Sequence, residues 1–146
     1  MCIRDSRDGN PNVTARVTAE VMLLSRWQAV DLYLADVVQL VEELSMTRCD
    51  ETLRQLSRGA HEPYRVVLRG LRELLRHTRA AIEAELAGEI PPEGEILRSV
   101  EQLWRPLHAC YQSLLQCGMQ IIADGALLDL LRRVRCFGVH LSLIHI

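Results

Sequence analysis

The residues best suited to chemistry lie near the start of the chain, in the run Arg7-Asp8-Gly9-Asn10-Pro11. Glycine, asparagine and proline in close succession exclude regular structure and favour a specific turn. Such a turn can bring a guanidinium, a carboxylate and an amide together, which suits anion binding or the orientation of a neighbouring catalytic loop. The alternative is a rigid turn whose Asp and Asn side chains bond their own backbone, and composition alone does not decide between the two.

The histidines and cysteines do not form a recognisable catalytic or metal-binding motif. The five histidines include no His-x-x-x-His pair, which argues against a zinc site. The five cysteines are odd in number and fit no zinc template, so we interpret them as small buried thiols in a reducing cytoplasm, with a disulfide or metal role as the alternative. The sequence also lacks a glycine-rich phosphate loop and a nucleophile motif around serine or cysteine.

A cluster of arginines near the C-terminal end is the remaining candidate for ligand binding. Arg132, Arg133 and Arg135 occupy the last turns of a predicted helix, where cations oppose the negative end of the helix dipole. Binding of an anionic effector is the alternative interpretation of the same three side chains.

The elements that must position these residues are nearly all helical. A long helix is predicted from residue 14 to about residue 45, with Asn12 or Thr14 as its cap. Apolar residues recur at intervals of three and four, with a gap at 27–31, and form one stripe. The stripe consists of Val17, Val21, Leu24, Leu34, Val37, Val41 and Leu44. Such a helix is roughly 45–50 Å long at 1.5 Å per residue, which indicates that it belongs to something larger than a compact domain of this size.

Two shorter helices follow. Asp50 is the predicted cap of a helix that Gly59 ends, and Pro63 is the first residue of a helix that Gly88 ends. The buried stripe of the second is Val67, Leu71, Leu74, Thr78, Ile82 and Leu86.

The last third of the chain contains two more predicted helices. One runs from about residue 95 to residue 117, with a break or restart near Pro106. Asp124 caps the other, which spans 125–136 and ends at Gly138. Only from Val139 does the sequence indicate a strand.

The composition fits a helical core and excludes several classes of partner. Of the 146 residues, 49% are apolar and only 4% aromatic, so Leu, Val and Ala supply most of the burial. A formal net charge of −2 provides no general basic field for nucleic acid, and no apolar run approaches the ~20 residues of a membrane span. All 17 basic residues are arginine, which we attribute to a GC-rich genome.

The two ends have an unusual explanation in the coding DNA. Residues 1–6 (MCIRDS) back-translate to ATG TGT ATA AGA GAC AG, and the reverse complement of that element, with one flanking base, encodes residues 141–146 (LSLIHI). One inverted DNA element, similar to the mosaic end of a transposase-based sequencing library, thus accounts for both termini. We expect both ends to be adapter-derived and residues 7–140 to be native, with coincidence as the alternative.

Ordered blocks of sequence resemble the phosphoenolpyruvate carboxylase family. Residues 7–14 resemble the family's Arg-Asp-Gly-Asn-Pro loop and the residues after it. Further blocks arrive in family order and at family-like spacing, at residues 24–27, 43–46, 62–65, 106–107, 110–114, 117–118, 122–125, 127–129 and 136–138. Together they cover essentially all of residues 7–140, which are therefore identified as a partial carboxylase domain, a minority of the family's much longer chains.

The resemblance implies both fold and activity. The residue patterns above predict an all-α segment, one long first helix plus about four to five others. The resemblance implies that this segment is the helical portion of a helix-rich enzyme built around an eight-stranded β/α barrel. It implies Mg²⁺- or Mn²⁺-dependent carboxylation of phosphoenolpyruvate by bicarbonate, through carboxyphosphate and an enolate, to oxaloacetate and phosphate. It also implies a cytoplasmic homotetramer under metabolite control.

The same resemblance implies that the catalytic groups lie outside the chain. The family's Thr-Ala-His-Pro-Thr motif belongs upstream, its metal-binding carboxylates and mobile glycine-rich loop belong downstream, and an arginine-bearing strand should follow Phe137-Gly138. We therefore expect no catalytic or metal-binding residue here, no activity in isolation, and poor solubility from exposed apolar stripes. The resemblance leaves residues 7–10 as an active-site-supporting loop and Arg65 as a candidate for binding a sugar-phosphate effector. A free-standing helical interaction or regulatory domain is the alternative function.

Overall fold

The computed structural model describes the chain from residue 11 to residue 143, with side chains described for residues 15–136. Every regular element in this range is helical, which confirms the all-α prediction. The elements are α1 (Pro11–Glu43), α2 (Glu51–Leu56), α3 (Pro63–Ala87), α4 (Glu101–Gln116), α5 (Gln120–Ile122), a π-helical turn (Ala123–Leu127) and α6 (Leu128–Leu143). None of the described helices is long and apolar enough to cross a membrane.

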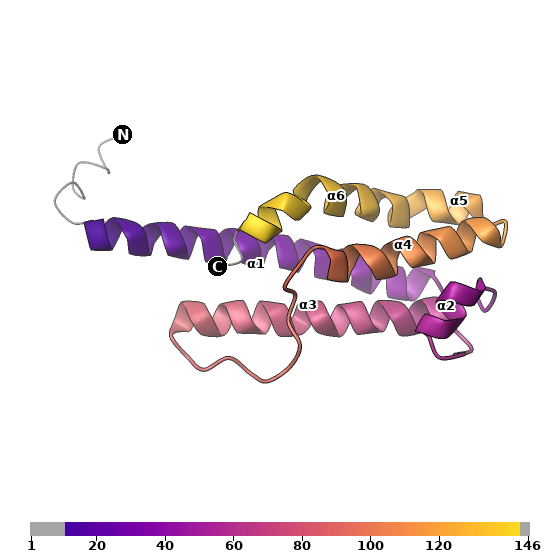
Figure 1. Cartoon of the computed structure of the whole chain (residues 1–146), viewed down its shortest axis with the longest axis horizontal. Helices are drawn as coiled ribbons and strands as arrows, with labels where there is room; N and C mark the ends of the chain where they lie inside the picture. The colour runs from indigo at the N-terminus through magenta and orange to yellow at the C-terminus, as the bar shows by residue number, and fades with distance from the viewer. Residues whose placement is uncertain (1–10, 144–146) are drawn as a thin grey trace.

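The helices form an elongated bundle around the C-terminal half of α1 (Figure 1). α3 runs alongside α1 for most of its own length, and α4 and α6 pack on this pair and on each other. α2 closes one end, where it contacts α3 and α4. The N-terminal end of α1 extends beyond the other helices, as Figure 1 shows.

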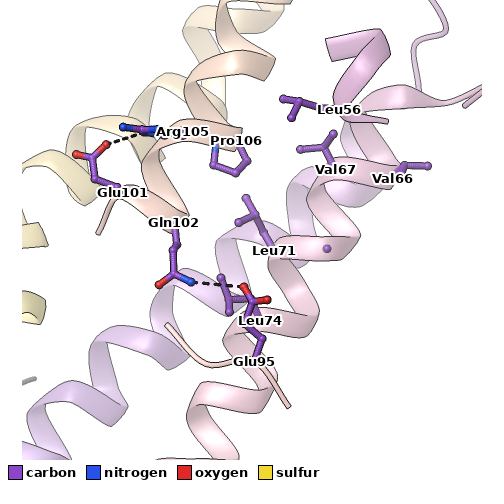
Figure 2. Close-up of a pocket in the computed structure, with 11 residues that line it drawn as sticks. Leu56, Val66, Val67, Leu71, Leu74, Glu95, Glu101, Gln102, Arg105 and Pro106 are labelled. Carbon is purple, nitrogen blue, oxygen red and sulfur yellow. Dashed lines mark hydrogen bonds and ion pairs between the residues drawn. The ribbon is translucent and has the colours of Figure 1, made fainter. Parts of the chain in front are cut away.

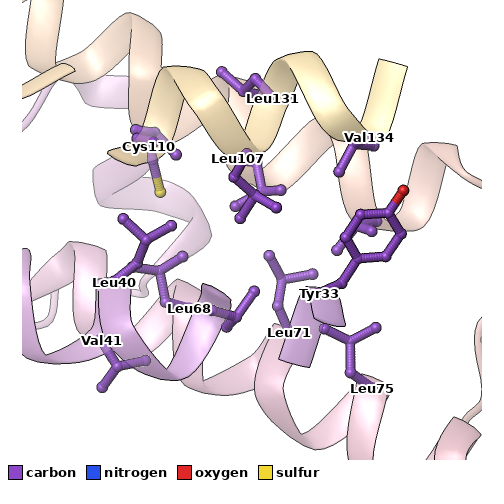
Figure 3. Packing of buried hydrophobic residues seen from close by; sticks show 14 of the residues in the cluster. Tyr33, Leu40, Val41, Leu68, Leu71, Leu75, Leu107, Cys110, Leu131 and Val134 are labelled. Carbon is purple, nitrogen blue, oxygen red and sulfur yellow. The ribbon is translucent and has the colours of Figure 1, made fainter. Parts of the chain in front are cut away.

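One apolar cluster joins the four long helices (Figure 3). Aliphatic side chains dominate it, as the low aromatic content predicts, and Tyr33 and Tyr64 are its buried aromatic members. The side chains labelled in Figure 3 come from all four helices: Tyr33, Leu40 and Val41 from α1, Leu68, Leu71 and Leu75 from α3, Leu107 and Cys110 from α4, and Leu131 and Val134 from α6.

Three helix boundaries follow directly from local sequence and confirm the predictions. The Asp50 carboxylate accepts a hydrogen bond from the Leu53 backbone N–H at 2.9 Å and so caps α2. Pro63 is the first residue of α3, where its missing N–H costs nothing. Gly88 ends α3 with φ +71°, a left-handed conformation that glycine adopts without a Cβ clash.

The prediction for α4 was wrong at its start and at Pro106. α4 begins at Glu101 and continues through Pro106 without a break. The residues before it are held outside a helix, because the Leu97 N–H donates to Thr78 Oγ1 at 2.7 Å and the Leu97 carbonyl accepts from Arg26 at 2.8 Å. Pro106 lies near the N-terminal end of α4, where the single backbone donor it lacks would have bonded Gln102.

The prediction for the last helix was wrong at its end and correct only in part at its start. Helical structure already begins at Gln120, but the backbone of Gly125 is not helical (φ −87°, ψ −129°) and the helix is kinked there, at the predicted start. Asp124 lies inside the π-helical turn and is not a cap. The Asp124 carboxylate accepts a hydrogen bond from Tyr111 at 2.8 Å instead. α6 then continues past Gly138 to Leu143, where a strand was expected, since an internal glycine costs a helix only about 1 kcal/mol relative to alanine.

The predicted stripe of α1 is correct only in its C-terminal half. Leu34, Val37, Val41 and Leu44 are buried in the core, as expected. Val21 and Leu24 are instead more than half exposed. The predicted stripe treats the apolar residues before and after the gap at 27–31 as one face. At 3.6 residues per turn, however, the residues on the two sides of the gap lie on different faces of the helix.

Candidate functional site

The predicted active-site-supporting loop, residues 7–10, lies outside the described residues. The described chain begins at Pro11, the next residue and the first of α1. The loop is therefore contiguous with the end of α1 that extends beyond the bundle (Figure 1).

Arg65, the candidate effector-binding residue, is bonded to the C-terminal end of α1. Its Nε donates to the Val41 carbonyl at 2.8 Å, and one terminal nitrogen donates to the Glu42 carbonyl at 3.2 Å. The other terminal nitrogen pairs with the Glu62 carboxylate at 2.8 Å. Carbonyls in the last turn of a helix lack intrahelical donors, so the guanidinium supplies the missing partners. An anionic ligand at Arg65 would share the guanidinium with these three groups.

The arginines of α6 divide into different roles. Arg133 pairs with Asp36 of α1 at 2.9 Å. Arg135 lies over the Trp104 ring of α4, 5.6 Å from its centroid, a cation–π contact. Arg132 is exposed. Two of the three arginines thus link α6 to other helices, and the structure does not bring the three together on one ligand.

Trp104 also stacks on His108, with ring centroids 5.3 Å apart and the planes inclined by 15°. Both rings line a cavity of about 250 Å³ beside α2, together with Asp50, Thr52, Arg105, Ala109 and Gln112. The Asp50 carboxylate is already used as the cap of α2, and Arg105 pairs with Glu101 at 3.2 Å. The cavity therefore has stacking surfaces, while its charged groups are bonded to neighbours on the same helices.

A second, more apolar groove separates α3 from α4 (Figure 2). Its volume is about 540 Å³, and Leu56, Val67 and Leu71 face Pro106 across it. Glu101–Arg105 and Gln102–Glu95 pairs lie at its polar side. Figure 2 shows both pairs as dashed contacts between residues of the groove itself. The groove presents apolar surface and no converging set of catalytic groups.

The best-buried polar network joins three elements. The Tyr64 and Ser113 hydroxyls lie 2.8 Å apart, and Ser113 Oγ also accepts the Asp50 N–H at 2.9 Å. Burial raises the pKa of Tyr64 to about 12, and burial likewise raises the pKa of the Cys110 thiol to about 12. Both groups are thus held protonated, which suits a structural role and not a nucleophilic one.

Groups that could bind a metal are not assembled in the described part of the chain. Between residues 11 and 143, no three His, Cys, Asp or Glu side chains are placed to hold a metal ion. The divalent cation that the resemblance implies therefore has no ligand set among these residues.

Comparisons with known proteins bear on what this helical segment belongs to. The family model described as phosphoenolpyruvate carboxylase matches residues 3–146. The chain belongs to the phosphoenolpyruvate carboxylase family. It is 58% identical over 135 residues to the phosphoenolpyruvate carboxylase of Aliivibrio salmonicida and 59% identical over 139 residues to that of Pectobacterium carotovorum. Each alignment covers 92% of this chain but only 15–16% of the relative. The chain therefore spans only a small part of the length of the curated relatives that it matches.

No complete catalytic or metal site is assembled among the residues whose side chains are described. Sequence reasoning named Arg65 but did not foresee its bonds to the end of α1, because they join residues 24 positions apart. It also missed the Tyr64–Ser113 pair, since a hydroxyl pair on two helices leaves no motif in the sequence. A Tyr directly after the first proline of α3 was the only available signal.

Proposed function

We propose that the polypeptide to which this segment belongs catalyses the carboxylation of phosphoenolpyruvate by bicarbonate, giving oxaloacetate and phosphate. The identity of 58–59% across 92% of the chain is the observation that carries the proposal. Aligned segments that fill only 15–16% of each relative favour this function over a free-standing helical interaction domain. Mg²⁺ or Mn²⁺, a cytoplasmic location and a homotetrameric assembly are proposed for the whole enzyme on the same family resemblance.

The segment by itself is proposed to be inactive. The family's catalytic histidine, metal-binding carboxylates and mobile loop belong to regions outside residues 7–140. The described residues include the buried hydroxyl pair of Tyr64 and Ser113 and arginines that bond a carboxylate or backbone carbonyls. Residues 1–6 and 141–146 are proposed to be adapter-derived, and the genomic sequence that surrounds residues 7–140 tests this directly.

An assay for oxaloacetate tests the main proposal. The uninterrupted parent polypeptide, supplied with phosphoenolpyruvate, bicarbonate and Mg²⁺, is coupled to malate dehydrogenase, and NADH oxidation is followed. We expect turnover that requires both substrates, and background rates from the 146-residue chain. A parent polypeptide without turnover would refute the activity, and turnover by the short chain would refute its proposed inactivity.

The supporting loop is tested in the same parent enzyme. Replacing Arg7 by Ala should lower kcat/KM by about tenfold or more if the loop orients reacting groups. Arg132→Ala is the matched control, since Arg132 is an exposed arginine of α6. Equal activity of the two variants would contradict a role for the loop in the active site.

Arg65 requires a control that separates ligand binding from its bonds to α1. Arg65→Ala removes the guanidinium, whereas Glu62→Gln removes the ion pair and leaves the guanidinium in place. If Arg65 binds a sugar-phosphate effector, only Arg65→Ala should abolish activation by glucose 6-phosphate. Activation that survives Arg65→Ala would leave Arg65 with the structural role alone.

A further inference from the structure

α1 carries a second apolar stripe on the side away from the core. Val17, Val21, Leu24 and Leu32 recur at intervals of four, three and eight residues, with Gln28 at the intervening position. These intervals place side chains along one face of a helix. Val21 is 59% exposed, Leu24 52% and Leu32 67%.

The two stripes of α1 face in opposite directions. Val21 precedes the buried Val30 by nine residues, which is about 2.5 turns at 3.6 residues per turn and so half a rotation. α1 is therefore apolar on both sides, whereas only one side is covered by the described helices. A helix that is apolar all round belongs in the interior of a larger structure.

A groove lies between this side of α1 and α6. It has a volume of about 320 Å³, and Gln28, Leu32 and Tyr33 line it together with the Asp36–Arg133 ion pair. Seven residues, or about two turns, beyond Leu32 the same side of α1 carries Gln39, whose amide donates to the Glu43 carboxylate at 2.8 Å. The apolar surface, named here the outer face and made of Val17, Val21, Leu24 and Leu32, thus ends before the C-terminal end of α1.

We infer that the outer face of α1 is the docking surface for an apolar helix of the same polypeptide, from the part of the carboxylase outside this segment. The inference rests on the segment being part of that longer enzyme. The aligned relatives extend well beyond the segment, which fills only 15–16% of each. Three of the four outer-face residues, Val17, Val21 and Leu24, lie in the first half of α1.

Thiol labelling tests the inference without depending on activity. Leu32→Cys places a thiol on the outer face, and Gln39→Cys is the matched control seven residues later on the same side of α1. Both positions are exposed, so neither substitution disturbs the core. Cleavage after arginine releases them in the peptide spanning 27–48, which contains no native cysteine, so mass spectrometry can follow modification by iodoacetamide at that position alone.

The comparison is made between the parent polypeptide and the 146-residue chain. We expect the thiol at position 32 to react about tenfold or more slowly than the thiol at position 39 in the parent, because docking must open before labelling, and at a similar rate in the short chain. Equal rates in the parent would overturn the inference. If labelling of the thiol at position 32 in the short chain slowed as the protein concentration rose, the inference would also be overturned, because a second copy of the chain would then cover the outer face. The oxaloacetate assay distinguishes the two proposals, because a parent polypeptide that is active but unprotected at position 32 would refute the docking inference alone.

Discussion

The two halves of α1 have similar apolar content but differ in how far their side chains are buried. Nine of the fifteen residues at 15–29 are apolar, and ten of fifteen at 30–44. None of the first group is buried, whereas seven of the second group are core residues. Those seven are Val30, Tyr33, Leu34, Val37, Leu40, Val41 and Leu44.

The difference shows that apolar content predicts burial only where a partner exists. α1 packs against α3, α6 and the π-helical turn, and its fully buried residues all lie in its second half. The first half reaches the bundle through partly buried side chains: Leu23, Trp27 and Ala29 pack against the core. Arg26 donates to the Leu97 carbonyl, and Trp27 donates to Glu83 at 3.0 Å. Within this segment one half of the helix belongs to a core and the other half presents a surface that the longer enzyme is proposed to cover.

The largest effect is expected from truncation in the core. Leu107 is fully buried, so Leu107→Ala should lower the free energy of unfolding by about 2–5 kcal/mol. Leu24→Ala, on the outer face, should change it by less than about 0.5 kcal/mol in the 146-residue chain. Urea unfolding of both variants measures the contrast. Comparable losses would show that the outer face is already packed in the short chain.

A second contrast comes from alkaline pH. The ordinary pKa is 9.0 for the Cys110 thiol and 10.0 for the Tyr64 hydroxyl, and both are raised to about 12 in the fold. The unfolded chain therefore loses these protons first, so stability is full below pH 9 and falls as the pH rises toward 12. Urea unfolding across this range should show the decline. Cys110→Ala and Tyr64→Phe should each flatten it, and an unchanged slope in both would contradict the assignment.

A smaller loss of stability should follow from removing the hydrogen bond between Thr78 and Leu97, which holds the residues before α4. Thr78 Oγ1 donates to the Leu74 carbonyl at 2.7 Å and accepts from the buried Leu97 N–H. Thr78→Val leaves that N–H without a partner and should cost about 1–3 kcal/mol. Thr78→Ser keeps the hydroxyl and should cost less. Because Leu97 also bonds Arg26, only the valine variant should speed amide exchange around Arg26 in α1.

The boundaries that the sequence predicts are those set by one local interaction. The Asp50 cap, Pro63 at the start of α3 and Gly88 at its end depend on neighbouring backbone groups alone. The start of α4 depends on Thr78 and Arg26, which lie far from Leu97 in the chain, so no local pattern could place it. Gly138 resembles a helix end in sequence, yet α6 continues through it. Gly125 does interrupt the helical backbone, although helical structure is present on both sides of it.

The candidate site was less predictable than the fold. Arg65 could be named from its resemblance to a family motif, but its bonds to the Val41 and Glu42 carbonyls require the packing of α3 against α1. The role of residues 7–10 stays a prediction, since they lie outside the described residues. The family itself could be identified from ordered blocks, and the relatives are 58–59% identical over 92% of the chain.

The difference between the two halves of α1 is tested most directly by amide hydrogen exchange. In the 146-residue chain we predict fast exchange at residues 18–26 and slow exchange at 34–43, because only the second group contains fully buried core residues. In the parent polypeptide both groups should exchange slowly. Equal protection of the two groups in the short chain, or continued fast exchange at 18–26 in the parent, would contradict the account.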